Sequence, residues 1–252
     1  MSKAFLKNIY FIDVFDSEVD KSISTHTLYM ETVSNFNFVD ANVNHKIFQL
    51  SSKEELFNKI EQIKNEIQKS DYTLLYLSIH GSCDLDGIIS TNKELISWEE
   101  LKDKTREINI KTNDRFFIIL ASCHGKYIGE KINLKNKSPF RAIIASKYEV
   151  YSKDIYNIFH DFFQSLLYDN NIIEAFKKIQ DNQKLFFYTD THKALEYGFK
   201  KFIENKDKKY PKLYQEYLSE NRKPHYSYNE YRNLLDSKIP EILENIEKDF
   251  FI

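Results

Sequence analysis

The sequence has few of the residues that build disulfide-bonded or membrane-spanning proteins. Its 252 residues include only 2 cysteines, 5 glycines and 4 prolines. Two cysteines are too few for a disulfide-built secreted scaffold, and they favour a reducing compartment. Nowhere does the sequence have the ~18 consecutive apolar residues that a membrane-spanning helix needs. The N-terminus also lacks the apolar core and cleavage site of a signal peptide, so we expect a soluble, cytoplasmic protein.

An excess of charge of one sign is also missing. The 36 Lys and Arg residues nearly balance the 38 Asp and Glu residues, so the net charge of −2 predicts no global attraction to nucleic acid or membranes. One stretch, residues 200–212, is locally basic and lies beside Tyr214, a pattern compatible with binding RNA, DNA or an acidic partner. Because Glu204, Asp207 and Glu216 interleave with its lysines, we favour a solvated helix face over nucleic-acid binding.

Short apolar runs alternate with helical patterns through most of the chain. Residues 72–79 and 116–120 are apolar almost continuously, which is typical of strands buried on both faces of a parallel sheet. Similar runs cover residues 9–15, 46–50 and 140–145. Strands that alternate with helices predict βαβ units, and therefore a three-layer α/β sandwich with a mostly parallel sheet and helices on both faces.

The predicted helices begin at recognisable capping residues. Ser52 with Glu55, and Ser97 with Glu100, each form an S-x-x-E capping box, whose side chains satisfy backbone donors of the first helical turn. Two more helices are predicted to start near Ser152 and at Asn171.

The sheet domain is predicted to span residues 1–190. Residues 191–252 have a helical pattern, punctuated by Pro211, Pro224 and Pro240. We expect this segment to be a helical C-terminal extension that packs on the sheet domain.

Reactive side chains follow two of the predicted strands. His80-Gly81 comes directly after residues 72–79, and Cys123-His124 follows residues 115–122. Sites in open α/β sheets form beyond the carboxyl ends of the strands, so neighbouring strands would bring His80 and Cys123 together. Imidazole can take the thiol proton and later protonate a leaving amine. Gly81 has no Cβ, so its backbone N–H can approach a substrate and stabilise an oxyanion.

Together these segments resemble the caspase-fold cysteine peptidases. Ile79-His80-Gly81 precedes Ala121-Ser122-Cys123-His124-Gly125 by about 43 residues, and in caspases the histidine lies ~50 residues before the cysteine. The pattern is most similar to the bacterial CHAT (caspase-like, associated with tetratricopeptide repeats) and separase-like group. The resemblance covers roughly residues 70–185. It implies a cysteine endopeptidase in which Cys123 forms a thioester, His80 is the base, and the N–H groups of Gly81 and Cys123 form the oxyanion hole.

The resemblance also implies partners and subsites. The substrate would be a protein, a regulatory or activating protein partner is expected, and no metal or organic cofactor is needed. A bacterial stress or defence pathway is the implied setting. Asp13, at the end of the first strand, is a candidate for a specificity pocket, although we favour a solvated acid that ends the strand. Ser146, Tyr148 and Glu149 are candidates for substrate contact. Caspases have Gln-Ala-Cys-Arg-Gly around the nucleophile, and metacaspases have an acid where this chain has Ala121, so a basic P1 residue is not supported there.

Three alternatives stay open. The same fold could act as a catalytically inactive module that binds a peptide. His80, Cys83, Cys123 and His124 could instead hold zinc, although adjacent Cys123 and His124 would point apart. Cys83 is either a buried loop thiol, which we favour, or the partner of Cys123 in a regulatory disulfide.

Overall fold

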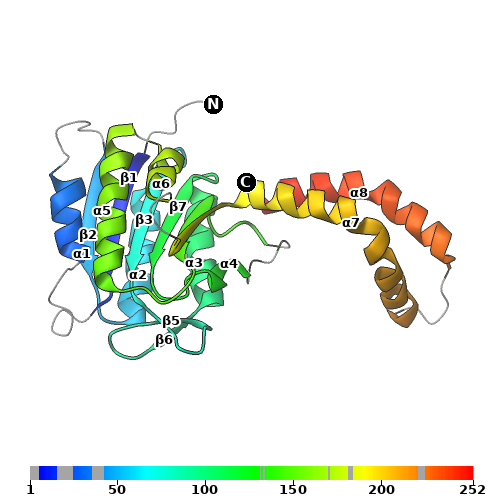
Figure 1. Ribbon diagram of the computed structural model, residues 1–252, viewed down its shortest axis with the longest axis horizontal. Helices are drawn as coiled ribbons and strands as arrows, with labels where there is room; N and C mark the ends of the chain where they lie inside the picture. The colour runs from blue at the N-terminus through cyan, green and yellow to red at the C-terminus, as the bar shows by residue number, and fades with distance from the viewer. Residues whose placement is uncertain are drawn as a thin grey trace. The chain divides into compact units, whose positions relative to one another are not determined.

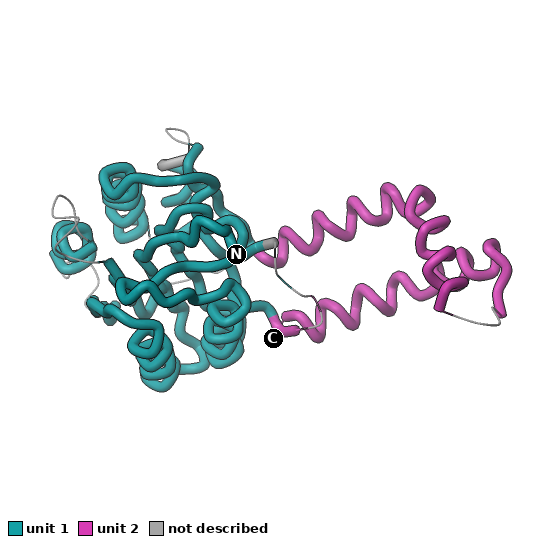
Figure 2. The backbone as a smooth tube through the Cα atoms, turned by 90° about the horizontal axis from the view of Figure 1, so that it is seen from below, with its two compact units in different colours: residues 1–133, 138–190 teal, residues 134–137, 191–252 magenta. Residues whose placement is uncertain are grey.

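The computed structural model describes residues 6–15, 25–35, 43–130, 132, 134, 136–169, 171–180, 184–220 and 225–251. The chain forms two compact units (Figure 2). One contains residues 1–133 and 138–190, and the other contains residues 134–137 and 191–252. Within the described ranges, no helix is both long and apolar enough to cross a membrane.

A six-stranded sheet forms the centre of the first unit, with the strand order β2-β1-β3-β7-β8-β9 (Figure 1). The first five strands are parallel, and β9 pairs with β8 in the antiparallel direction. The strands are β1 (Leu6–Asp13), β2 (Asn44–Gln49), β3 (Tyr72–Ser78), β7 (Phe116–Ala121), β8 (Ala142–Ser146) and β9 (Phe186–Asp190). Residues of β3 and β7 are buried on both faces, as the continuous apolar runs predict.

Helices cover both faces of this sheet (Figure 1). One face packs against α1 (Thr25–Tyr29), a π-helical turn at Met30–Ser34, α5 (Ser152–Asp169) and α6 (Ile172–Gln180). The other packs against α2 (Lys53–Glu66), α3 (Trp98–Lys111) and the single turn α4 (Tyr127–Glu130). The predicted three-layer α/β sandwich is therefore confirmed.

The predicted helix starts are confirmed in atomic detail. The side chains of Ser52 and Ser97 each accept a hydrogen bond from the backbone N–H three residues further on. In turn, the side chains of Glu55 and Glu100 accept a hydrogen bond from the backbone N–H of the capping serine. Asn171 Oδ1 accepts from the N–H groups of the first turn of α6.

A small antiparallel sheet follows β3 directly and was not predicted. Its strands are β4 (His80–Gly81), β5 (Gly87–Ile89) and β6 (Leu95–Ser97). Strands of two or three residues are too short to produce a detectable alternation of apolar and polar positions.

The second unit contains two long helices, α7 (Thr191–Glu220) and α8 (Tyr228–Phe250), as the helical pattern predicts. The prediction that prolines punctuate this segment is wrong for Pro211 and Pro240, which lie inside α7 and α8. Proline removes one backbone hydrogen bond and bends a helix without always ending it. Figure 1 shows α7 bending in its C-terminal part. Pro224 lies outside the described residues.

Candidate active site

The strands that precede His80 and Cys123 are neighbours in the sheet. β3 and β7 pair in parallel, with Ser78 opposite Ala121 at the last rung. Ile79 N–H donates to the Ala121 carbonyl at 3.4 Å, which continues the ladder one residue further. The two strand ends therefore arrive side by side, as the sequence predicts for adjacent parallel strands.

Strand alternation places both side chains on one face of the sheet. In β3, Leu74 and Tyr76 pack in the core beneath α5, whereas their neighbours Leu75 and Leu77 pack in the opposite core. In β7, Ile119 and Ala121 share the α5 face. Successive side chains point to opposite faces, so positions 80 and 123 continue the α5 face of their strands.

The backbone of Gly81 lies directly against Cys123. A Cβ at position 81 would lie 3.0 Å from the Cys123 carbonyl carbon, 3.1 Å from its Cβ, and closer still to its carbonyl oxygen. None of the described glycines has a positive φ, so Gly81 serves this close approach and not a left-handed turn. The structure thus brings the His80-Gly81 segment and Cys123 together.

Two aromatic side chains hold the His80 segment in place. The Phe15 ring meets the His80 ring edge-on, with ring centroids 4.3 Å apart. The fully buried Trp98 donates from Nε1 to the Leu85 carbonyl at 2.8 Å, which ties down the loop between β4 and β5. The sequence pattern assigns a role to neither residue, although Trp98 is the single tryptophan of the chain and lies inside the capping box of Ser97 and Glu100.

Backbone donors are available where an oxyanion would form. Ser82 N–H donates to the Gly87 carbonyl at 2.9 Å, so Gly81 belongs to the next, non-hydrogen-bonded pair and its N–H points away from β5. The N–H groups of His124 and Lys126 donate to carbonyls at the end of β8. Cys123 N–H, the preceding donor, has no acceptor among the described residues.

Ser146 is a fully buried link between the Cys123 loop and β8. Its hydroxyl donates to the Ser122 carbonyl and accepts from Gly125 N–H at 3.1 Å. Because the Ser146 hydroxyl is fully buried and already both donates and accepts a hydrogen bond, it holds the loop in position. This geometry favours a positioning role over the predicted contact with substrate.

The Cys123 thiol is half-buried and has a defined partner. Sγ donates to the Val150 carbonyl oxygen at 3.8 Å. His124 adopts a left-handed φ of 57°, and its N–H donates to the Tyr148 carbonyl at 3.0 Å. The helix that follows Cys123 is the four-residue α4, which begins at Tyr127, so it supplies little helix dipole to the thiol.

The two thiols are both free, and they differ in exposure. Cys83 is exposed in the loop after β4, so the favoured reading of a buried loop thiol is wrong. The loop belongs to the unpredicted small sheet, which turns residue 83 out to solvent. The residues of the alternative zinc set are not assembled, because no group of three or more His, Cys, Asp or Glu side chains within the described ranges could hold a metal.

Asp13 is buried at the carboxyl end of β1, next to Ser78 of β3. Burial raises its pKa to about 6, and hydrogen bonds from the Thr25 side chain and the Phe15 backbone partly oppose this. Its Oδ1 has no hydrogen-bond partner within the described part of the chain. With an exposed fraction of 7%, Asp13 is not an open pocket wall.

The two remaining predicted subsite residues lie on the surface beyond β8. Tyr148 is 58% exposed and Glu149 is exposed, so a ligand can reach both. The Lys126 ammonium lies 4.9 Å from the centre of the Tyr127 ring and 5.8 Å from that of Tyr148. Cation–π contacts of this kind order the rim near Cys123. Nothing in the sequence assigns Lys126 a role at the rim, because Tyr148, which its ammonium contacts, lies far from it along the chain.

The fold and the site together define a class of structure, an α/β sandwich in which histidine and cysteine follow two adjoining parallel strands. The structure is similar to the crystal structure of caspase-1 from Spodoptera frugiperda, with a TM-score of 0.50 and 15% sequence identity, over 75% of this chain and 87% of that chain. The predicted caspase-like fold is therefore confirmed, and at this identity the likeness concerns the fold alone. No protein-family model and no curated protein matches the sequence.

Proposed function

We propose that this chain is a caspase-like cysteine endopeptidase with Cys123 as nucleophile and His80 as base. His80 takes the thiol proton, and the thiolate attacks the carbonyl carbon of the scissile peptide bond. The N–H groups of Gly81 and Cys123 stabilise the oxyanion. The C–N bond then breaks, the amine leaves with the proton from His80, and water hydrolyses the thioester.

One observation carries this proposal. His80 and Cys123 follow neighbouring strands on the same face, and the Gly81 backbone packs against Cys123. Placement of the base and the nucleophile at adjoining strand ends is what acyl transfer requires of the scaffold. The caspase-like fold supports the proposal, because that scaffold fits a protein substrate.

The finer features of the function are also proposals. We place the chain nearest the CHAT and separase-like group, on the motifs around His80 and Cys123. Tyr148 and Glu149 are the proposed substrate contacts because they are exposed beyond β8. The proposed partner is one regulatory protein that activates the site, with bacterial stress or defence as the setting.

Thiol reactivity tests the proposal. Wild type, Cys123→Ala, His80→Ala and Cys83→Ala are exposed briefly to a limiting acyloxymethyl-ketone probe, and labelled peptides are mapped by mass spectrometry. We expect fast labelling at Cys123 that His80→Ala slows and Cys83→Ala leaves unchanged. Cleavage of a peptide library should follow the same order. Equal, slow labelling of both cysteines in wild type and in His80→Ala would contradict the proposal.

A second candidate function is a peptide-binding module without catalysis. The hydrogen bond of the Cys123 thiol to the Val150 carbonyl favours it, because the single thiol hydrogen is then directed at a backbone oxygen and not at an imidazole nitrogen. In that case the probe labels Cys123 no faster than Cys83, whereas peptides bind and protect Tyr148 from chemical modification.

A further inference from the structure

The second unit has one apolar stripe on each of its two long helices. In α7 the stripe recurs at positions 195, 199, 202, 203, 210, 213 and 217, and in α8 at positions 228, 231, 235, 239, 242, 246 and 250. Spacings of three, four and seven residues put each set on one face of its helix. Figure 2 shows the helices as the two arms of a hairpin.

This hairpin leaves part of its own apolar surface uncovered. Only Thr191, Leu195 and Tyr210 of α7 and Phe250 of α8 are buried. Ile203 and Ile242 keep exposed fractions of 39% and 43%, and the remaining stripe residues are intermediate. Two helices cannot enclose two stripes, whereas four can, as in a helix bundle.

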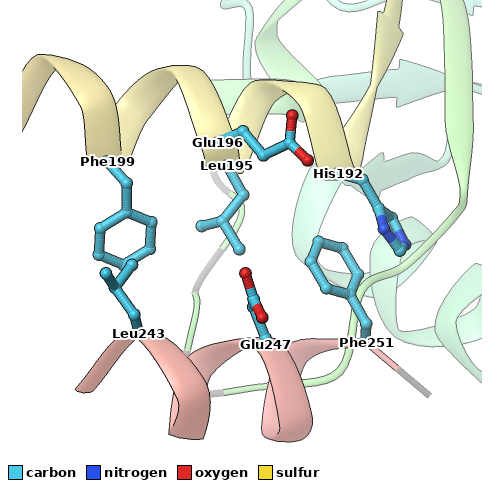
Figure 3. Close-up of a pocket in the computed structure, with 7 residues that line it drawn as sticks. All are labelled: His192, Leu195, Glu196, Phe199, Leu243, Glu247 and Phe251. Carbon is cyan, nitrogen blue, oxygen red and sulfur yellow. The ribbon is translucent and has the colours of Figure 1, made fainter. Parts of the chain in front are cut away.

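The two arms also fail to close on each other near their base. A cavity of about 450 Å³ lies between them, lined by Leu195 and Phe199 of α7, by Leu243 of α8 and by Phe251 directly after it. Figure 3 shows these side chains facing one another across the gap, with Glu247 among them. The rings of His192 and Phe251 stack with centroids 3.5 Å apart, so the arms touch there, but side chains that line an unfilled gap have no packing atoms on that side.

The charges of the two helices are complementary. Helix α7 carries seven lysines against five acidic residues, and α8 carries six acidic residues against three basic ones. Their net charges are therefore +2 and −3. In a two-fold symmetric pair, α7 of one copy packs against α8 of the other, and both new contacts join opposite charges.

The size of the surface also suits a second copy. Helix α8 has 23 residues and is about 34 Å long. Two helices, each about 10 Å wide, give a face of roughly 700 Å². Stable interfaces bury about 800 Å² per partner. From these observations we propose that the α7–α8 hairpin is a dimerisation surface, whose occupant is the same hairpin of a second copy in a four-helix bundle.

Oligomeric state of the full chain tests this directly. Sedimentation equilibrium at micromolar concentrations should give a dimer for wild type. Ile203→Glu combined with Ile242→Glu should raise the dimer dissociation constant about tenfold or more, since it places charge on the buried face. Ile110→Glu is the matched control, because Ile110 is 45% exposed on α3 of the other unit, and it should leave the dimer intact.

A charge exchange separates lost association from lost folding. One chain carries Glu247→Lys and Asp249→Lys beside the α8 stripe, and the other carries Lys200→Glu and Lys209→Glu beside the α7 stripe. Each should dimerise weakly alone, and their mixture should form heterodimers as tightly as wild type. A wild type that stays monomeric, a dimer insensitive to the isoleucine variants, or a mixture that fails to associate would overturn the proposal. These readouts are independent of peptidase activity.

Discussion

Replacing Gly81 with alanine tests whether the contact between β4 and Cys123 organises the site. The added Cβ would lie 3.0 Å from the Cys123 carbonyl carbon and nearer to its oxygen, whereas ordinary contact begins at 3.4 Å. Both groups belong to the backbone, so no flexible side chain can move aside. Either the small sheet or the Cys123 loop must shift.

The size of the effect follows from that displacement. Restoring ordinary contact needs a movement of about 1 Å, and a misplacement of that size lowers catalytic rates about 100-fold. Forcing an extra methyl group into a packed region costs about 1–3 kcal/mol of unfolding free energy. We therefore expect Gly81→Ala to lose both stability and Cys123 reactivity.

Urea unfolding and the rate of Cys123 alkylation by the acyloxymethyl-ketone probe measure the two effects. Gly129→Ala is the matched control, because its added Cβ meets no described atom within 4 Å in the exposed turn of α4. It should leave reactivity unchanged and stability equal or higher by about 0.4–1 kcal/mol. If Gly81→Ala behaves like Gly129→Ala in both assays, the argument that Gly81 packs on Cys123 is refuted.

Three further substitutions test other parts of the site and its frame. Ser146→Ala removes a buried hydroxyl and leaves a loop N–H without its acceptor, so urea unfolding should show a loss of about 1–3 kcal/mol, together with slower Cys123 labelling; an unchanged variant would contradict the positioning role. Burial raises the pKa of the Asp13 carboxyl to about 6. Its contribution to the free energy of unfolding is therefore complete below about pH 4, where Asp13 is protonated, and is lost as the pH rises through 6. Asp13→Asn should therefore be more stable than wild type at pH 8 by up to about 3 kcal/mol, with no such gain at pH 4; parallel pH profiles would contradict this. Arg141→Ala removes the cation that pairs with the buried carboxylates of Asp114 and Asp190, and calorimetry should show a loss of about 3–5 kcal/mol; a loss below 1 kcal/mol would contradict the pairing.

Local physics explains which elements were predictable. A capping box such as Ser52 with Glu55 is complete within four residues, so its hydrogen bonds can be predicted without knowing the fold. A strand buried on both faces, such as β3, must be apolar throughout its length. The pairing of β3 with β7 does not follow from such local patterns; the sequence predicts only that His80 and Cys123 would meet if the two strands were neighbours.

The missed elements depend on contacts between distant segments. Strand β9 is five residues long and runs directly into α7, so its sequence does not mark where the sheet ends. The small sheet exists because Gly81 and Gly87 lack side chains at two close backbone approaches, to Cys123 and to Ile96. From the sequence alone, a glycine does not show which backbone segment will pack against it.

The subsite predictions show the same limit at the level of single residues. Ser146 follows a strand, as a substrate-binding residue would, yet its hydroxyl faces the Cys123 loop and its exposure is nil. The partner of the Cys123 thiol is harder still to predict, because it is the backbone carbonyl of residue 150. Any amino acid there would supply that oxygen. No side-chain pattern around Cys123 therefore marks residue 150 as its neighbour, and only the folded chain brings the two together.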